Sequence, residues 1–288
     1  MIAAHQYIQQ KQILWAMNRG INLVRSEITM GIQGYTSTLN QNLFLPLGES
    51  ARKSFSDANG NEINDKTGNP SKMQAVYSSS ALCVNVFQYW ELIGQVPVIA
   101  AACGFCEDGD KFSEQICFEE KHPIKGIVGA PPNIDVVLHN SNESPFQCFA
   151  IESKFAEPYE GMKSGIALAY LKEEDLWGDI PDLYWLAKGI CPENNKTHYF
   201  DSAQIIRHTL GLKSSYAKDR FKLLYLWYDA LGKEGAEHRE EIDAFTEIAK
   251  AAGVNFLSLS YQELIVRLAE KYYQEHTEYL KYLSDRYY

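Results

Sequence analysis

The sequence of 288 residues lacks a continuous apolar run of the length, about 18 residues, that a membrane-spanning helix needs. The longest apolar stretch, residues 96–105 ("VPVIAAACGF"), is too short and contains Pro97. The first twenty residues also lack the apolar core of a secretory signal peptide. These absences predict a cytoplasmic protein that does not associate with a membrane.

Cysteine is scarce, and its spacing gives little support for a metal or redox centre. Six cysteines occur, and only Cys103 and Cys106 form a close pair, in "CGFC". A second close pair that would complete a zinc site is missing, as is the βαβ pattern expected around a thioredoxin-type motif. We therefore expect reduced thiols and keep a metalloprotein built around Cys103 and Cys106 as an alternative.

Excess positive charge is also lacking, since the formal net charge is −10. This balance argues against a generic binder of polyanions, because non-specific affinity for nucleic acid depends on neutralising phosphates. Residues 201–228 differ from the rest, with five basic residues against two acidic ones. A local anion site therefore remains compatible with the sequence, although DNA binding would depend on a metal, a partner or a homodimer.

The apolar patterns predict a mixed α/β protein. Helices are expected at residues 5–30, 78–94, 201–212, 237–253 and 261–288, and strands at 114–127, 131–140, 146–156, 221–229 and 254–260. Residues 159–200 are expected to be loosely helical, and residues 31–72, rich in Gly, Asn, Ser and Asp, to form a long loop. We expect Asp201 or Ser202 to cap the helix that follows, and Gly211 to end it.

The stretch "CFAIESKFAEPY", residues 148–159, combines a strand pattern with paired charges. Phe149, Ile151 and Phe155 share one face of an extended strand, so Glu152 and Lys154 share the other. A salt-bridged hairpin at the surface would give the same pattern and would contribute little energy. The side chains that contact Glu152 and Lys154 decide between a surface salt bridge and a functional site.

Asp135 is the residue best placed to reach it. It lies inside the apolar segment "NIDVVL" on the preceding strand, where a carboxylate is costly unless it has a role. If the two strands pair, Asp135, Glu152 and the carbonyl of Ser153 form an oxygen-rich site of the kind Mg²⁺ prefers, with Mn²⁺ able to substitute. Lys154 beside it would orient or deprotonate an attacking water.

The arrangement Asp135–x16–Glu152–x–Lys154 resembles the PD-(D/E)xK nuclease superfamily. Residues 76–288 are also similar to a bacterial group of restriction-endonuclease-like proteins, through segments such as "SSSALCVNVF", "FAIESKF" and "QIIRHTLGL". The resemblance implies an αβββαβ core with a mixed sheet, preceded by an elaboration at residues 1–75. It also implies Mg²⁺-dependent hydrolysis of DNA, with Asp135 and Glu152 as ligands and Lys154 as the catalytic lysine.

Four further residues are candidates for the same site. Glu119 on the first strand and Glu157 after the third could add carboxylate ligands, and Gln204 and Arg207 share one face of the helix that follows. Some exonuclease-like relatives of that superfamily carry Gln-x3-Tyr at that point, where this chain has Gln204-x3-His208; a lone histidine such as His208 is more often a structural residue. The main alternative function is a catalytically silent module that binds nucleic acid or protein.

Overall fold

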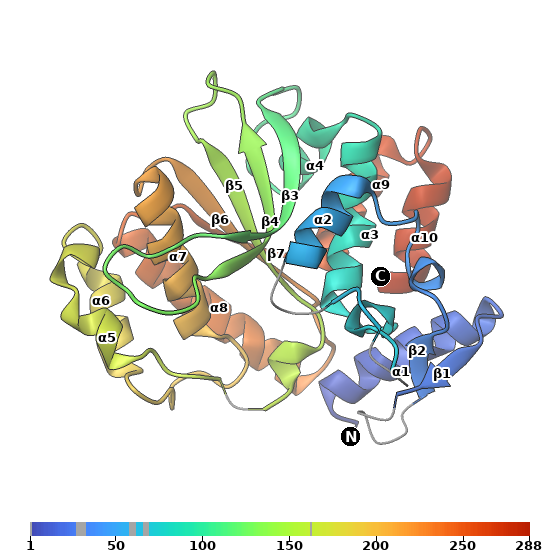
Figure 1. Ribbon diagram of the computed structural model, residues 1–288, viewed down its shortest axis with the longest axis horizontal. Coiled ribbons are helices and arrows are strands. Elements are labelled where there is room, and N and C mark those ends of the chain that lie inside the picture. Colours follow the sequence, from blue (N-terminus) through green and yellow to red (C-terminus); the bar gives the residue numbers. More distant parts are fainter. Residues whose placement is uncertain (1, 27–32, 58–61, 66–68, 162) are drawn as a thin grey trace.

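A five-stranded mixed sheet forms the centre of the molecule in the computed structural model, which describes residues 2–26, 33–57, 62–65, 69–161 and 163–288 (Figure 1). The strand order is β3–β4–β5–β6–β7, with the first three strands antiparallel and the last three parallel. The strands are β3 (Ser113–Lys121), β4 (Asn133–Asn140), β5 (Cys148–Lys154), β6 (Phe221–Trp227) and β7 (Phe256–Ser260). All five predicted strands are therefore present.

Helices cover both faces of this sheet, so the side chains of its strands alternate between two apolar cores. Phe149 and Ile151 of β5 enter one core, whereas Cys148 and Ala150 enter the other. The helices of the first core are α1 (Ala4–Asn18), α2 (Glu49–Asp57), α3 (Ser79–Leu92), α4 (Val96–Ala102), α9 (Tyr261–Tyr272) and α10 (Thr277–Tyr287). Those of the second are α6 (Pro181–Gly189), α7 (Ser202–Tyr216) and α8 (Lys233–Ala251), with the short α5 (Leu168–Lys172) beside them. No helix in the described part of the chain is both long and apolar enough to cross a membrane.

The N-terminal segment differs from its prediction. Helix α1 ends at Asn18 instead of continuing to residue 30, because Gly20 turns the chain with a φ of 69°. A two-stranded sheet follows, made of β1 (Leu23–Arg25) and β2 (Gln33–Thr36), and the part of the predicted helix at 27–30 lies outside the described residues. The predicted loop at 31–72 also contains α2, whose Phe55 is buried against Phe118 of β3.

Two helix ends were also predicted wrongly. Gly211 does not end α7, which continues to Tyr216; a Cβ at position 211 would lie 2.7 Å from the backbone oxygen of His122. The glycine therefore allows a close approach between α7 and the chain after β3. The predicted final helix is two helices, and the second begins after His276, whose ring packs against Trp90.

A buried arginine joins the two ends of the chain. The guanidinium of Arg286 on α10 donates hydrogen bonds to Gln12 of α1, to Asn42 and to the backbone oxygen of Val76. It also stacks on Trp15, with its central carbon 4.1 Å from the ring centroid. Helices α1, α2 and α10 thus share one apolar core with α3, and this core supports the sheet from one side.

Candidate active site

The site forms where two neighbouring strands separate. The ladder between β4 and β5 stops at the pair Val136–Ile151, one step before Asp135 and Glu152 would face each other. Beyond that point the side chain of Asp135 replaces the backbone ladder, because its Oδ2 accepts a hydrogen bond of 2.8 Å from the backbone N–H of Ser153. Strand β5 remains paired with β6 up to Lys154 and Trp227, so its end is held in place.

Glu152 and Lys154 lie side by side on the α7 face of β5. The Nζ of Lys154 is 2.5 Å from the Oε1 of Glu152, and the side chain of Glu152 is 1% exposed. Lys154 keeps 16% of its side chain exposed, so its ammonium group is at the edge of the solvent. This pair is buried rather than a salt bridge on a solvated sheet face.

The second oxygen of Glu152 faces a histidine. Nδ1 of His208, on α7, lies 3.2 Å from Oε2 of Glu152, and both side chains are buried. Burial, together with the charges of Lys154 and Arg207, lowers the pKa of His208 to about 3, so the ring is neutral at physiological pH. Within the described structure neither Oε2 of Glu152 nor Nδ1 of His208 has a hydrogen-bond partner of acceptable geometry.

Glu119 adds a third carboxylate. The β3–β4 register places it opposite Asp135, between the pairs Phe118–Val136 and Glu120–Ile134. Its φ is 53°, a conformation that is rare for residues other than glycine, and its Oε2 accepts a hydrogen bond of 2.7 Å from Asn133. Burial and the charge of Asp135 raise the pKa of Glu119 to about 8.

The carboxylates repel one another in the absence of a cation. Burial, and then the charge of Glu152, raise the pKa of Asp135 well above its usual range. Burial also raises the pKa of Glu152, although Lys154 opposes that shift. For Lys154, burial acts to lower the pKa, but the charges of Glu152 and Asp135 outweigh it and the pKa is raised. Lys154 therefore keeps its positive charge at neutral pH. Holding the neighbouring carboxylates ionised close together costs free energy, because their charges repel one another.

The other predicted residues lie around this centre. Glu157 is exposed and accepts a hydrogen bond of 2.9 Å from the backbone N–H of Phe155. It lines a cavity of about 440 Å³ beside the N-terminus of α3. Gln204 and Arg207 are partly exposed on α7, and neither side chain makes a hydrogen bond or ion pair with the central carboxylates in the part of the chain that the structure describes.

Two residues near the centre were missed or given too little weight. His208 contacts Glu152, and its only signal in the sequence was its place four residues after Gln204. Lys163 lies close enough for its charge to act on Lys154 and Glu157, and it donates hydrogen bonds to the backbone oxygens of Glu157 and Glu160. No pattern marks Lys163, because it follows the strand in an irregular segment.

Cys103 and Cys106 do not belong to the cluster of three possible metal ligands found among the described residues. Cys103 is buried, and burial raises the pKa of its thiol. Burial and the charge of Asp110 raise the pKa of Cys106 to about 11. Both thiols are therefore protonated at neutral pH, and the cluster of possible metal ligands found among the described residues lies elsewhere, around Cys117.

The mixed sheet and its covering helices make this a protein of the α/β class. Two carboxylates and a lysine lie where two of its strands separate, and they form a candidate hydrolytic site. The model of one protein family, described as "Restriction Endonuclease associating with ARP", matches residues 23–288. The chain therefore belongs to this restriction-endonuclease family, and the resemblance seen in the sequence is confirmed. Membership indicates nuclease activity. Neither the curated proteins nor the solved structures contain a match.

Proposed function

We propose that this protein is a divalent-metal-dependent nuclease that hydrolyses phosphodiester bonds in DNA. The observation that carries the proposal is the separation of β4 and β5, which brings Asp135, Glu152 and Lys154 together at one partly buried edge. Membership of a restriction-endonuclease family supports DNA as the substrate.

The residues at this edge fit a hard divalent cation. Oε2 of Glu152 is buried without a hydrogen-bond partner among the described residues, and Asp135 and Glu119 gain stability as anions only beside a positive charge. Asp135, Glu152 and the carbonyl of Ser153 would hold Mg²⁺ or Mn²⁺. When bound, such an ion supplies electrostatic stabilisation of the phosphoryl oxygens and an acidified water.

Lys154 has a specific part in this scheme. In the metal-free protein the charges of Glu152 and Asp135 raise its pKa, so it keeps its proton at neutral pH. Its ammonium group would donate hydrogen bonds that orient the attacking water and stabilise the charge that develops on the phosphate. Glu152 fixes the position of that ammonium group at 2.5 Å. His208 in turn fixes the position of Glu152, because its neutral ring packs beside the second carboxylate oxygen at 3.2 Å.

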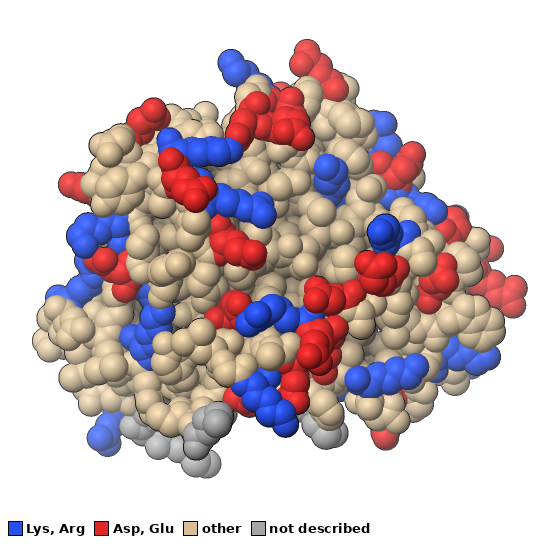
Figure 2. All heavy atoms as spheres, turned by 180° about the vertical axis from the view of Figure 1, so that it is seen from behind, with Lys and Arg blue, Asp and Glu red and all other residues tan. Residues whose placement is uncertain are grey.

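DNA binding requires positive charge that the chain as a whole lacks. On the face shown in Figure 2, basic and acidic side chains are interspersed rather than gathered into one basic area. Beside Lys154, the charges of Lys163 and Arg207 act on residues of the site. The description of the family names an association with ARP, and we propose that such a partner, or a second copy of this chain, completes the DNA-binding surface.

The test is DNA cleavage by the purified chain. Supercoiled plasmid, linear duplex and single-stranded DNA are incubated with the protein in Mg²⁺, in Mn²⁺ and in EDTA. We expect cleavage that depends on the metal and falls at least about 1,000-fold in Asp135→Ala and in Lys154→Ala, because each removes a group that stabilises the transition state. Glu114→Gln, an exposed carboxylate on β3, is the matched control and should cleave at the parental rate.

The pattern of products separates the remaining possibilities. Nicked and linearised plasmid indicates an endonuclease, whereas attack on linear substrates alone indicates an exonuclease. Cleavage that persists in both variants would reject the assigned residues. If no substrate is cut in either metal, with or without the partner, the chain is a silent binding module and the proposed activity is wrong.

A further inference from the structure

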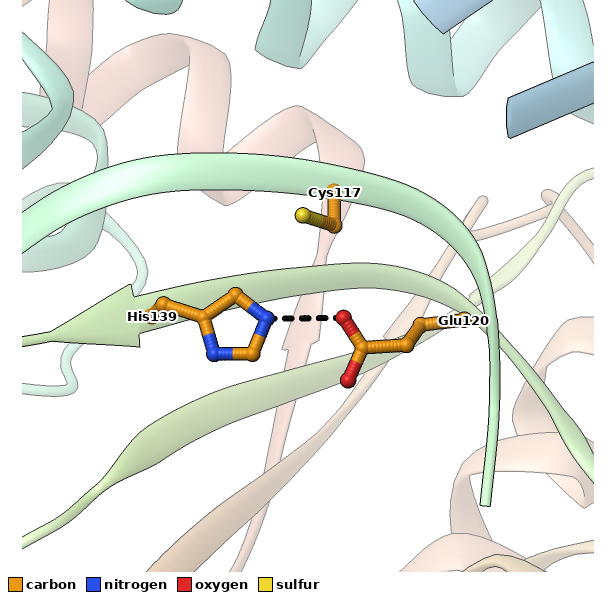
Figure 3. A group of neighbouring side chains, drawn as sticks. All are labelled: Cys117, Glu120 and His139. Atoms are coloured by element: carbon orange, nitrogen blue, oxygen red, sulfur yellow. Dashed lines mark hydrogen bonds and ion pairs between the residues drawn. The ribbon is translucent and has the colours of Figure 1, made fainter. Parts of the chain in front are cut away.

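A second cluster of metal-binding side chains lies on the same face of the sheet. Cys117 and Glu120 of β3 and His139 of β4 each offer one ligand atom, and these three atoms lie within 4.8 Å of one another. Figure 3 shows the sulfur, the carboxylate and the imidazole facing one small space between the two strands. Antiparallel pairing brings them together, since Cys117 pairs with Val137 and Gln115 with His139.

A second histidine, His122, lies outside this group of three atoms but contacts its carboxylate. The side chain of His122 is 3% exposed, and its Nε2 lies 3.2 Å from Oε1 of Glu120. This nitrogen makes no hydrogen bond of acceptable geometry with any residue that the structure describes. His139 approaches the other oxygen of the same carboxylate, with Nε2 2.7 Å from Oε2. An imidazole nitrogen that is buried without a hydrogen-bond partner costs free energy unless a ligand completes its coordination.

The surroundings orient these donors in the manner of a metal site. Nδ1 of His122 lies 3.0 Å from Oγ of Ser215, on α7, which leaves Nε2 directed at the cluster. The hydroxyl of Tyr216, the next residue, donates to Oε1 of Glu120 at 3.4 Å. Contacts that hold the ligands from a neighbouring element are typical of protein-bound zinc.

We propose that Cys117, Glu120, His122 and His139 form a zinc-binding site that fastens β3 and β4 beneath α7. One thiolate, one carboxylate and two imidazoles match the donor types and the number that Zn²⁺ takes in a closed, structural site. Two ligands about 2.1 Å from a tetrahedral ion lie about 3.4 Å apart, which is close to the 3.2 Å separation of His122 and Glu120. The site is independent of the proposed nuclease chemistry.

Without zinc the same groups have an ordinary explanation as an ion pair. Hydrogen bonding to Cys117 and to Glu120 raises the pKa of His139 to about 10, and Glu120 is its anionic partner. That pair leaves Nε2 of His122 without a hydrogen bond of acceptable geometry among the described residues, and it gives Cys117 no role as a thiolate. Zinc would engage all four groups and displace protons from the thiol and the imidazole.

The test begins with the parental, full-length protein stripped of metal and titrated with Co²⁺, a spectroscopic substitute for zinc. We expect one Co²⁺ per chain, with a thiolate-to-metal charge-transfer band and the visible absorption of a tetrahedral ion. One equivalent of Zn²⁺ should abolish both signals. The absence of a thiolate band at saturating Co²⁺ would overturn the proposal.

Variants identify the ligands. Cys117→Ser should lose the thiolate band and Ser215→Ala should weaken Zn²⁺ binding about tenfold, as expected for loss of a group that orients a ligand. Cys106→Ser, in the close cysteine pair, and Glu152→Gln, in the candidate active site, should retain the band. A band lost in Cys106→Ser and kept in Cys117→Ser would place the metal at the other cysteine pair and reject this site.

One measurement requires no variant and so does not depend on a variant folding. Alkylation of native protein, followed by mass spectrometry, reports the reactivity of Cys117 and of the partly buried Cys191 in the same sample. One equivalent of Zn²⁺ should slow the alkylation of Cys117 at least about tenfold and leave Cys191 unchanged. Equal protection of both residues, or of neither, would contradict the proposal.

Discussion

The carboxylate of Asp135 accepts a hydrogen bond from the backbone N–H of Ser153 at the point where β4 and β5 separate. This bond takes the place of a ladder pair and fixes the distance between the two strands. The residues on either side of Ser153 are Glu152 and Lys154, so the same contact sets the positions of all three charged groups. The candidate active site is therefore a product of one break in strand pairing.

Asp135→Asn should stabilise the metal-free protein at alkaline pH. A carboxyl whose pKa is raised on folding binds its proton more tightly in the folded state, so its contribution to stability falls as the pH rises above the unfolded value of about 4. At pH 8 we therefore expect the variant to be more stable than the parent, because it carries no charge at this position. At pH 4 the difference should be close to zero.

Urea unfolding in EDTA at the two pH values measures this difference. Only the gap between variant and parent is informative, because His139, with a pKa raised to about 10, loses its own stabilising contribution in both proteins as the pH rises above about 6.5. Glu114→Gln should show no gap at either pH. A variant less stable than the parent at pH 8 would mean that the hydrogen bond to Ser153, rather than the buried charge, dominates.

His208→Ala should impair cleavage without unfolding the protein. The ring packs against the second oxygen of Glu152, and loss of such an orienting contact costs about 10–100-fold in metal affinity or activity. His208→Asn, which places an amide near the position of Nδ1, should retain most of the rate. Mg²⁺ titration of the cleavage rate measures both variants, and equal rates in His208→Ala and the parent would remove His208 from the account.

Gly211→Ala should destabilise the protein despite the higher helix propensity of alanine. The new Cβ would lie 2.7 Å from the backbone oxygen of His122 and 2.9 Å from Pro132, so α7 would have to move away from the sheet. We expect a loss of about 1–3 kcal/mol, as for overpacking of a core. Gly178→Ala, where nothing lies within 4 Å of the new Cβ, is the control for thermal unfolding. Unchanged stability in Gly211→Ala would show that this contact is loose.

Arg286→Met should destabilise the protein strongly. The substitution leaves the side-chain oxygen of Asn42 and the backbone oxygen of Val76 without their donor, and removal of a buried charged group from its network costs about 3–5 kcal/mol. Lys281→Met, on the exposed side of the same helix, should change the free energy of unfolding by less than about 0.5 kcal/mol. Similar effects of the two substitutions would contradict a joining role for Arg286.

Local patterns in the sequence were sufficient for the centre of the molecule. The period of two in "FAIESKF" predicted that Glu152 and Lys154 share a face, and the short connection after Asn140 predicted that the strands carrying Asp135 and Glu152 pair. Both features depend on residues close together in the chain. The order of strands and helices followed from the same local signals.

The remaining parts depend on contacts between distant residues. Phe55 packs against Phe118, and Asn42 accepts a hydrogen bond from Arg286. Both partners are distant in the sequence, so local patterns predicted a loop for the segment before α3. The role of His208 depends on the packing of α7 against β5, which places its ring beside Glu152. In the cluster at Cys117, only the register between β3 and β4 brings His139 to Glu120, and no compact motif announces it.

The most direct test of the central claim compares Mg²⁺ binding with DNA cleavage in Lys154→Met. Calorimetry measures the ion, and single-turnover cleavage of plasmid measures the chemistry. The account predicts that this variant still binds Mg²⁺, because its carboxylates remain, while its cleavage rate falls at least about 1,000-fold. Asp135→Asn should lose both. Parental cleavage by Lys154→Met, or cleavage by Asp135→Asn without bound Mg²⁺, would contradict the assignment of this site.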